Sequence, residues 1–586
     1  MMDRLKFKRL KDAITFSGRK LKPFREKMRE AHRQYVGTHY GDNGSEGTRP
    51  LNMLEMGVTA YLQQLASRNP QVLVNTRKSS LRIAAVECEH AINQTLLDID
   101  FENELRNWVM QALFSVGIMK VGIQVDYMAE IDGEEIPHTS VFAESISLDD
   151  WVHDVTADKW DPQRVGFCGH KYLMTKRELS SNPNFSKNLT AKLQPRDLNE
   201  HDEMLGESDR LDEIGYGKKS TDGEYLDRIE LWDIWLPEDR KVVTMSTELS
   251  EPVHEVEWEG PDRGPYHLLG FNPVLANIMP LPPIANWMDL DDLENKLINH
   301  LGRQASRQKT VTFVTQQGRK DGERVIRTND GDTVVVDNPQ NIKEARYGGI
   351  DQQTLAFALN VKGLTSYIMG NLDAMAGLGS SADTLGQEKM ISATVSDRVR
   401  AMQASVVSAT KDVIEDIGFW LWRSPTTQIH MARDIPGTDF AVDASWPHAA
   451  DEYGVDMDLR QGDFEGYDFN IEQFSMQDLS PQIRLQTLRD IWQRDIVPLI
   501  QTGLKPDINK YLALVAKYSN MHELTDIIPE LQAYSDDPQN SGGGGGGGGP
   551  HEYIRHNVSE GMTAQAQEQQ QMQNLMTASA PQQQAG

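Results

Sequence analysis

The feature that most constrains this chain is a very long helical pattern in its second half. From Gln387 to Trp422, apolar residues recur at helical spacing over about 36 residues. At 1.5 Å per residue, such a helix extends roughly 54 Å. Helices of this length usually span a whole subunit or an assembly. The apolar stripe consists of Ile391, Val395, Val399, Met402, Val406, Val413, Ile417 and Trp420.

A stretch of small residues precedes this helix. Residues 371–390 read NLDAMAGLGSSADTLGQEKM, and GLGSSA within them fits the loose dinucleotide pattern G-x-G-x-x-G/A. That pattern requires a buried strand before the loop. Residues 351–370 are instead helical in period, with Phe357, Val361, Leu364 and Ile368 spaced by four, three and four. The sequence therefore favours a loop between two helices, which either contacts a partner or is a buried connector.

The chain is too long for one hydrophobic core. At 586 residues it predicts three or four structural units. It has no run of 18 apolar residues, so we expect no membrane span, and its first residues lack the apolar stretch of a signal peptide. The two cysteines, Cys88 and Cys168, lack metal-ligand spacing and are interpreted as buried or incidental thiols in a reducing compartment.

Charge is unevenly distributed along the chain. The formal net charge of -28 argues against a protein that simply coats nucleic acid. Residues 1–33 nevertheless hold twelve Lys or Arg against four Asp or Glu, which is consistent with an amphipathic surface helix or with docking to an acidic or nucleic-acid partner. Residues 197–213 contain eight acids and are interpreted as a solvated loop, whereas residues 303–346 carry a local charge of +3.

Periodicity divides the rest of the chain into helical and β-rich parts. Three helical segments lie between residues 51 and 117, and strands follow from Lys120 to about Tyr266, with a hairpin turn at Asp132 and Gly133. After the proline-rich MPLPPIANW, a helix is predicted over 286–308. Two short strands, KTVTFVTQQ and GDTVVVDN, then enclose the turn-rich GRKDGERVIRTNDG, and a helical pair is predicted over about 480–535.

No pattern in the sequence indicates an active site. There is no phosphate-binding G-x-x-x-x-G-K-[ST] motif, no H-E-x-x-H and no G-x-S-x-G. His153, Asp154, Asp158 and Asp161 lie close together, but their spacing fits no calcium loop and favours turn-capping aspartates. We therefore predict no catalytic residues, no cofactor and no metal, and expect that the protein is not an enzyme.

The order of these elements resembles the portal proteins of tailed bacteriophages. The more specific pieces are RPLNMLEMGVTAYLQQLASRNPQVLV, LRNWVMQALFSVGIMKVGIQV, PLPPIANWMDLDDLENKLINHLGRQASRQK and residues 371–390, and the resemblance covers roughly residues 45–540. It implies an α+β, mainly helical subunit with wing, stem, clip and crown that assembles into a ring. The basic N-terminal segment, the acidic loop and the polyglycine tail depart from the family pattern and receive no role from it.

The resemblance also implies a division of the chain into ten segments. They are a basic N-terminal arm (1–44), the wing (45–285), the first stem helix (286–308), the clip (309–350), the second stem helix (351–372), the tunnel loop (373–386), the long helix (387–423), a wing return segment (424–479), a helical crown (480–540) and a Gly- and Gln-rich flexible tail (541–586).

The family's function supplies the remaining expectations. The resemblance implies a ring of about twelve subunits at one capsid vertex of the virion, assembled in the host cytoplasm, through which double-stranded DNA is packaged and ejected. The expected partners are the terminase large subunit, head-tail adaptor and tail proteins, and major capsid and scaffolding proteins, with no membrane. The tunnel-loop residues facing DNA would be Ala376, Gly377, Leu378, Gly379, Ser380 and Ser381, and the clip contacts to motor, adaptor or DNA would be Arg319, Lys320, Arg324 and Arg327.

Other classes of function remain as alternatives. A scaffold or an internal ejection protein would share the acidic composition and the glutamine-rich tail. A packaging ATPase or nuclease fits less well, because the phosphate-binding loop is missing from the sequence.

Overall fold

A computed structural model of the full chain describes most of its first 476 residues. The described ranges are 3–39, 50–131, 134–181, 185–193, 228–328, 338–370, 385–424, 429–434, 441–450, 456–472 and 475–476, with a few single residues besides. The chain divides into two compact units, Met1–Leu479 and Ser480–Gly586. The predicted crown and tail lie outside these ranges, all of which belong to the first unit.

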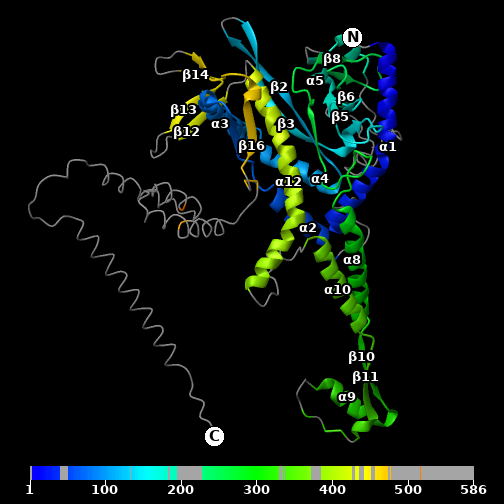
Figure 1. The fold of residues 1–586 in the computed structure, drawn as a ribbon. Helices are drawn as coiled ribbons and strands as arrows, with labels where there is room; N and C mark the ends of the chain where they lie inside the picture. The colour runs from blue at the N-terminus through cyan, green and yellow to red at the C-terminus, as the bar shows by residue number, and fades with distance from the viewer. Residues whose placement is uncertain are drawn as a thin grey trace, which may run out of the picture. The chain divides into compact units, whose positions relative to one another are not determined.

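The first unit is a mixed α/β structure, which confirms the coarser part of the predicted fold class (Figure 1). Its largest core joins three early helices to the long helix. These are α2 (Met53–Leu65), α3 (Arg82–Asp98), α4 (Phe101–Phe114) and α12 (Leu385–Arg423). Along α12, the described part of the predicted stripe is buried in this core: Val399, Met402, Val406, Val413, Ile417 and Trp420. The helical period therefore identified the buried face of α12 correctly from Val399 onward.

A three-stranded sheet begins directly after α4 in the sequence. Strand β2 (Gly117–Ile131) pairs antiparallel with β3 (Glu134–Ile146), and its first residues also pair with β9 (Tyr266–Leu269). The predicted hairpin about Asp132 and Gly133 is thus confirmed. The register shifts between Val125 and Tyr127, which marks a bulge in β2.

A five-stranded antiparallel sheet forms the second half of the β-rich part. Its strands, in spatial order, are β4 (Trp151–His153), β5 (Cys168–Thr175), β6 (Arg228–Leu236), β7 (Lys241–Met245) and β8 (His254–Glu257). Two short helices, α5 (Lys176–Ser181) and α6 (Lys187–Thr190), follow β5.

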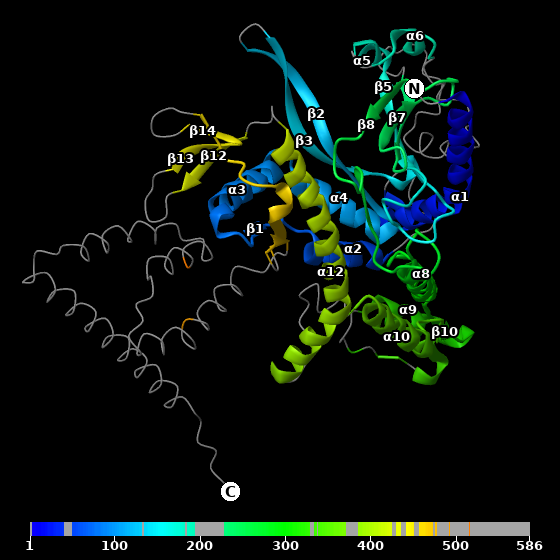
Figure 2. The same cartoon turned by 45° about the horizontal axis from the view of Figure 1, so that its top comes forward.

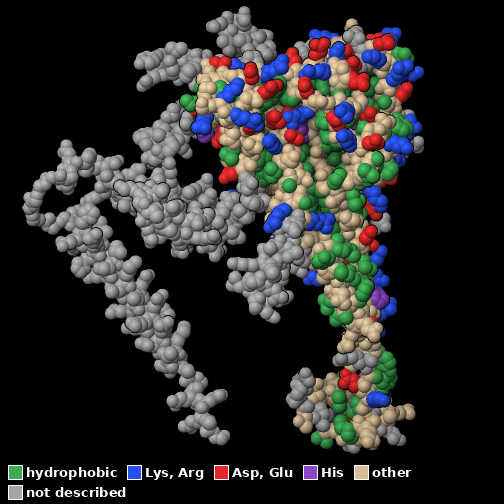
Figure 3. Space-filling view, viewed as in Figure 1, with side chains coloured by type: hydrophobic (Ala, Val, Ile, Leu, Met, Phe, Trp, Pro, Cys, Tyr) green, Lys and Arg blue, Asp and Glu red, His purple; other side chains and the backbone are tan. Residues whose placement is uncertain are grey.

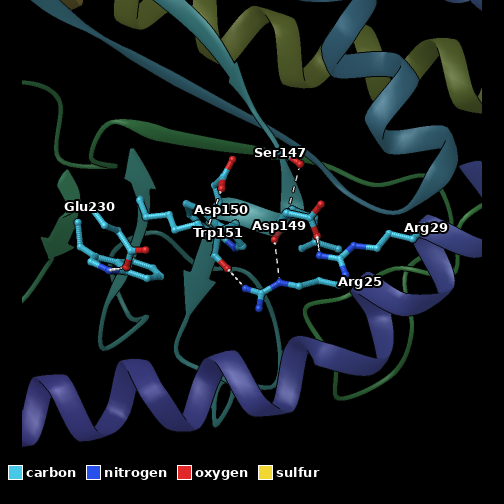
Figure 4. A network of polar contacts seen from close by, with 10 residues as sticks. Arg25, Arg29, Ser147, Asp149, Asp150, Trp151 and Glu230 are labelled. Carbon is cyan, nitrogen blue, oxygen red and sulfur yellow. Dashed lines mark hydrogen bonds and ion pairs between the residues drawn. The ribbon is translucent and has the colours of Figure 1, made fainter. Parts of the chain in front are cut away.

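The basic N-terminal segment is a helix that packs against this sheet. Helix α1 (Arg4–Val36) buries Phe7, Leu10 and Ile14 against residues of β6 and β7. Further along, the buried Arg25 donates hydrogen bonds to the carbonyl oxygens of Leu148 (3.1 Å) and Trp151 (2.8 Å), as Figure 4 shows. The segment is therefore part of the folded unit along one face.

Residues after α12 return to the beginning of the unit. Five strands follow: β12 (Ile429–Asp434), β13 (Ala441–Trp446), β14 (His448–Ala450), β15 (Asp456–Asp458) and β16 (Tyr467–Ile471). Strand β16 pairs antiparallel with β1 (Val72–Thr76), directly before α3. Within the described residues, the first and last strands are therefore hydrogen-bonded neighbours.

The cysteines and the aspartate-rich turn are structural, as predicted. Cys88 and Cys168 are both buried, and burial raises the pKa of the Cys88 thiol to about 12. Asp154 accepts hydrogen bonds from the backbone N–H and the hydroxyl of Thr156, and Asp161 accepts one from the N–H of Gln163. His153 is buried and its Nδ1 accepts a hydrogen bond from the Trp151 indole, and burial lowers its pKa to about 4.

Candidate functional site

Two antiparallel helices and the insertion between them form the most distinctive part of the unit. Helix α8 (Ala285–Ser306) and helix α10 (Gln352–Ile368) lie side by side in Figures 1 and 2 and contact each other along their length. The predicted helix over 286–308 is thus confirmed within two residues at each end. Asp351 begins α10 by accepting hydrogen bonds from the N–H and hydroxyl of Thr354, and its own N–H donates to Gln304 of α8 (3.1 Å).

The two helices are anchored to α2 at the same end of the pair. Asp291 of α8, which is fully buried, accepts a hydrogen bond from the Met53 N–H. At the end of α10, the Met369 carbonyl accepts one from the Tyr61 hydroxyl (2.9 Å), and the Tyr61 ring lies 5.1 Å from that of Trp287. The pair is therefore fixed to the helical core through buried polar and aromatic contacts.

Helix α10 is apolar on more than one side. Lys362 is its only charged residue in 17. Val361, Ala358 and Thr365 are buried toward the unit, but Phe357, Leu364 and Tyr367 are 52%, 55% and 72% exposed. The predicted stripe of Phe357, Val361 and Leu364 is thus divided between a buried and an exposed side. A helix that is apolar all round is normally buried on all sides.

The exposed side of α10 contrasts with α8. In Figure 3, hydrophobic side chains gather over α10, whereas Lys, Arg, Asp and Glu side chains lie along α8. The exposed apolar residues of α10 are Leu355, Phe357, Leu359, Leu364 and Tyr367. We call this set the outward face of α10.

The insertion between the helices is a small sheet with one helix. Strand β10 (Lys309–Val314) pairs antiparallel with β11 (Ile342–Tyr347), and helix α9 (Arg319–Arg327) lies between them in the sequence. Two predictions were wrong here. The second strand was expected over 331–338, but its described residues (333, 335, 336 and 338) are not in a strand and the partner of β10 is β11. The turn-rich GRKDGERVIRTNDG contains α9. The glycine that suggested a turn, Gly322, is a packing position, because a Cβ there would lie 2.5 Å from the Val314 side chain.

The four predicted clip residues all lie on α9 with exposed side chains. Arg319 forms an ion pair with Glu323 (3.5 Å), and Arg324 forms one with Asp321 (3.7 Å). Lys320 and Arg327 have no such pair with any described residue. The Arg319–Glu323 pair is exposed on both sides and contributes little to stability, whereas the Asp321 partner of Arg324 is buried. Arg319, Lys320 and Arg327 therefore present positive charge that the folding of the insertion does not require.

The six predicted tunnel-loop residues, Ala376 to Ser381, lie outside the described residues. The segments that bracket them are described. Helix α10 ends at Ile368, Gly370 adopts a positive φ of 86°, and α12 begins at Leu385. Arg398 of α12 donates a hydrogen bond to the Ile368 carbonyl (2.7 Å), so the two helices meet beside the loop's first end. Because α10 is a helix, GLGSSA does not follow the strand that a dinucleotide site needs.

Two buried clusters of titratable residues join elements of the fold. Lys120 of β2 pairs with Asp233 of β6 (3.1 Å), and Tyr266 contacts both the Asp233 carbonyl and His170 Nδ1 (2.8 Å). Burial lowers the pKa of His170 to about 3, assisted by the Lys120 charge. These groups have protein partners, so the cluster connects the two sheets.

The second cluster holds α12 against β9. Arg263 lies 2.9 Å from Asp412 and 3.2 Å from Asp416, and Asp416 also contacts His267 Nε2 (2.9 Å). Burial raises the pKa of Asp416. Neither cluster was predicted from the sequence, because 87 acids offer too many possible pairs for composition to select among them.

Two comparisons with known protein sequences give no match. No protein-family model matches the sequence, and no curated protein matches it. Within the described part of the chain, no helix has the length and apolar character needed to cross a bilayer. Among the same residues, no group of three or more His, Cys, Asp or Glu is placed to hold a metal ion.

Proposed function

We propose that this chain is a portal protein: it forms a ring of about twelve copies at one capsid vertex of a tailed bacteriophage and conducts double-stranded DNA. The observation that carries the proposal is the outward face of α10. Helix α10 pairs with α8, the compact insertion lies between the two helices in the sequence, and α12 follows α10. A second copy would cover this face, and repetition of the same contact by rotation closes a ring.

The charge of the chain suits a conduit. Each Lys or Arg contact with phosphate adds salt-dependent affinity, which would slow a moving duplex. A net charge of -28 per copy repels DNA within a Debye length of about 8 to 10 Å and keeps it centred. In this proposal residues 373–386 reach the DNA, and small residues such as Gly377 and Ser380 approach its backbone closely. The protein performs no catalytic step.

Electron microscopy of the purified full-length chain tests the proposal. Negative-stain images should contain annular particles with a central hole. Particles without a hole, or a monomer at every concentration, would contradict it, and a non-annular assembly would favour a scaffold or an internal ejection protein.

Charge reversal on α9 is expected to impair packaging. In the proposal α9 meets the packaging motor, the later tail adaptor or DNA at the channel mouth. The variant Arg319→Glu, Lys320→Glu, Arg324→Glu, Arg327→Glu should form normal rings, because these side chains are exposed. DNase-protected DNA per capsid should fall at least about tenfold, since each lost charged contact costs about 1 kcal/mol or more.

A matched variant controls for the change in net charge. Lys176, Arg177, Lys187 and Lys192 are exposed on or beside α5 and α6, and their reversal to Glu makes the same charge change away from α9. Packaging should survive in this variant. If the α9 variant packages equally well, the assignment of Arg319, Lys320, Arg324 and Arg327 is wrong.

A further inference from the structure

One face of helix α1 packs against the rest of the unit, and the opposite face is exposed. The inner face buries Phe7, Leu10, Ile14 and Leu21 in two cores. Nearer the C-terminal end of the helix, Arg29 forms an ion pair with Asp149 (3.2 Å). Arg4 and Lys11 also contact the connection between β7 and β8, through Glu251 and the Leu249 carbonyl. These contacts hold the helix on the sheet without its other cations.

The remaining cations are exposed along the first two-thirds of the helix. They are Lys6, Lys8, Arg9, Arg19, Lys20 and Lys22, and none forms an ion pair with a described residue. Only Asp12 opposes them within the same stretch of α1. Residues 6 to 22 span roughly 24 Å of helix axis. We call these six side chains the cationic face of α1, the helix labelled in Figure 1.

The chemistry of this face favours one class of partner. A lipid surface would require an apolar helix face to insert, but Phe7, Leu10 and Ile14 are already buried in the protein. A protein partner would require buried apolar anchors at the centre of the contact, and the face offers only the exposed Leu5 and Phe16. A duplex backbone requires neither, because regularly spaced phosphates bind Lys and Arg electrostatically.

We infer that the cationic face of α1 binds the phosphate backbone of double-stranded DNA. This site is separate from the proposed channel, since it involves neither the α8–α10 pair nor residues 373–386, and it does not depend on ring formation. The face is a local cluster of cations on a chain with a net charge of -28, so its attraction for phosphate is short-ranged and binding depends strongly on salt.

Fluorescence anisotropy with a labelled 30-base-pair duplex and the full-length chain tests the inference. Binding should weaken with salt with a log–log slope of about -5 if six phosphates are contacted. The variant Lys8→Glu, Arg9→Glu, Arg19→Glu, Lys20→Glu should lose at least about tenfold in affinity at 50 mM salt, and its slope should fall to about -2. Circular dichroism checks that this variant is folded.

The matched variant with Lys176, Arg177, Lys187 and Lys192 reversed should bind the duplex within about threefold of the unchanged protein. Equal losses in both variants would show a bulk charge effect and overturn the inference. So would a protein that does not bind the duplex at 50 mM salt.

Two competitors separate the other partners. Polyglutamate that displaces the duplex at equal charge concentration would assign the face to an acidic protein. The second competitor is vesicles of phosphatidylserine and phosphatidylcholine. If the vesicles bind the unchanged protein but not the α1 variant, while the duplex binds both proteins, the cationic face of α1 is assigned to lipid. Either result overturns the inference. Electron micrographs of the full-length chain test ring formation separately, so failure of the DNA site and failure of the proposed ring can be distinguished.

Discussion

Leu364→Glu with Tyr367→Glu should convert the proposed ring into folded monomers. Both side chains lie on the outward face of α10 and are more than half exposed in the single chain, so the substitutions cost the isolated fold little. In a ring, however, each neighbour would bury two unpaired carboxylates. An uncompensated buried charge costs about 3 to 5 kcal/mol, which weakens each contact at least about 100-fold.

Sedimentation velocity and thermal melting measure this effect together. The variant should sediment as a monomer, and its melting temperature should equal that of the unassembled, unchanged chain. Lys362→Glu places a carboxylate on the same helix where an exposed charged residue already lies, and it should leave the oligomer intact. If the double variant remains annular, the outward face of α10 is not the contact between copies.

Arg25→Met should strongly destabilise the packing of helix α1 against the unit. The Arg25 side chain is 1% exposed, and its guanidinium donates to two backbone carbonyls, those of Leu148 and Trp151. Methionine has similar length but no donor, so both carbonyls would remain buried without these bonds. Each such group costs about 1 to 3 kcal/mol, and we expect a total loss of about 3 to 5 kcal/mol.

Urea unfolding followed by tryptophan fluorescence measures this loss, because Trp151 lies at the contact (Figure 4). Arg19→Met on the exposed side of the same helix is the control, and it should change the free energy of unfolding by less than about 0.5 kcal/mol. Equal effects of the two substitutions would mean that the Arg25 hydrogen bonds contribute nothing to stability.

Much of the fold was predictable because periodicity is a local signal. Helices α2, α3, α4, α8, α10 and α12 and the β2–β3 hairpin follow the predicted segments closely, since each repeats apolar residues at 3.6 or 2 positions. Residues 1–33 were given an amphipathic surface helix as one of two interpretations, and α1 is such a helix, with Phe7, Leu10, Ile14 and Leu21 buried. Strand β11 was missed because its charged IKEARY sequence gains its order from pairing with β10.

The candidate site was less predictable, for a different reason. On α10, apolar residues surround the helix, so the period shows that it is helical but not which side faces the unit. On α9, Gly322 indicated a turn although it provides close packing against Val314. Residues 376–381 lie outside the described part of the chain, and their role stays a prediction.

The pairing of β1 with β16 affects when the chain can fold during translation. Thr76 donates a hydrogen bond to Gly466, a residue 390 positions later. At about 5 to 20 residues per second, a ribosome needs roughly 20 to 80 s to reach that partner. Strand β1 must wait through this interval with an unpaired edge, while α8, the insertion and α10 emerge and can fold through contacts close in sequence. The middle of the nascent chain can therefore fold before strand β1 has its partner.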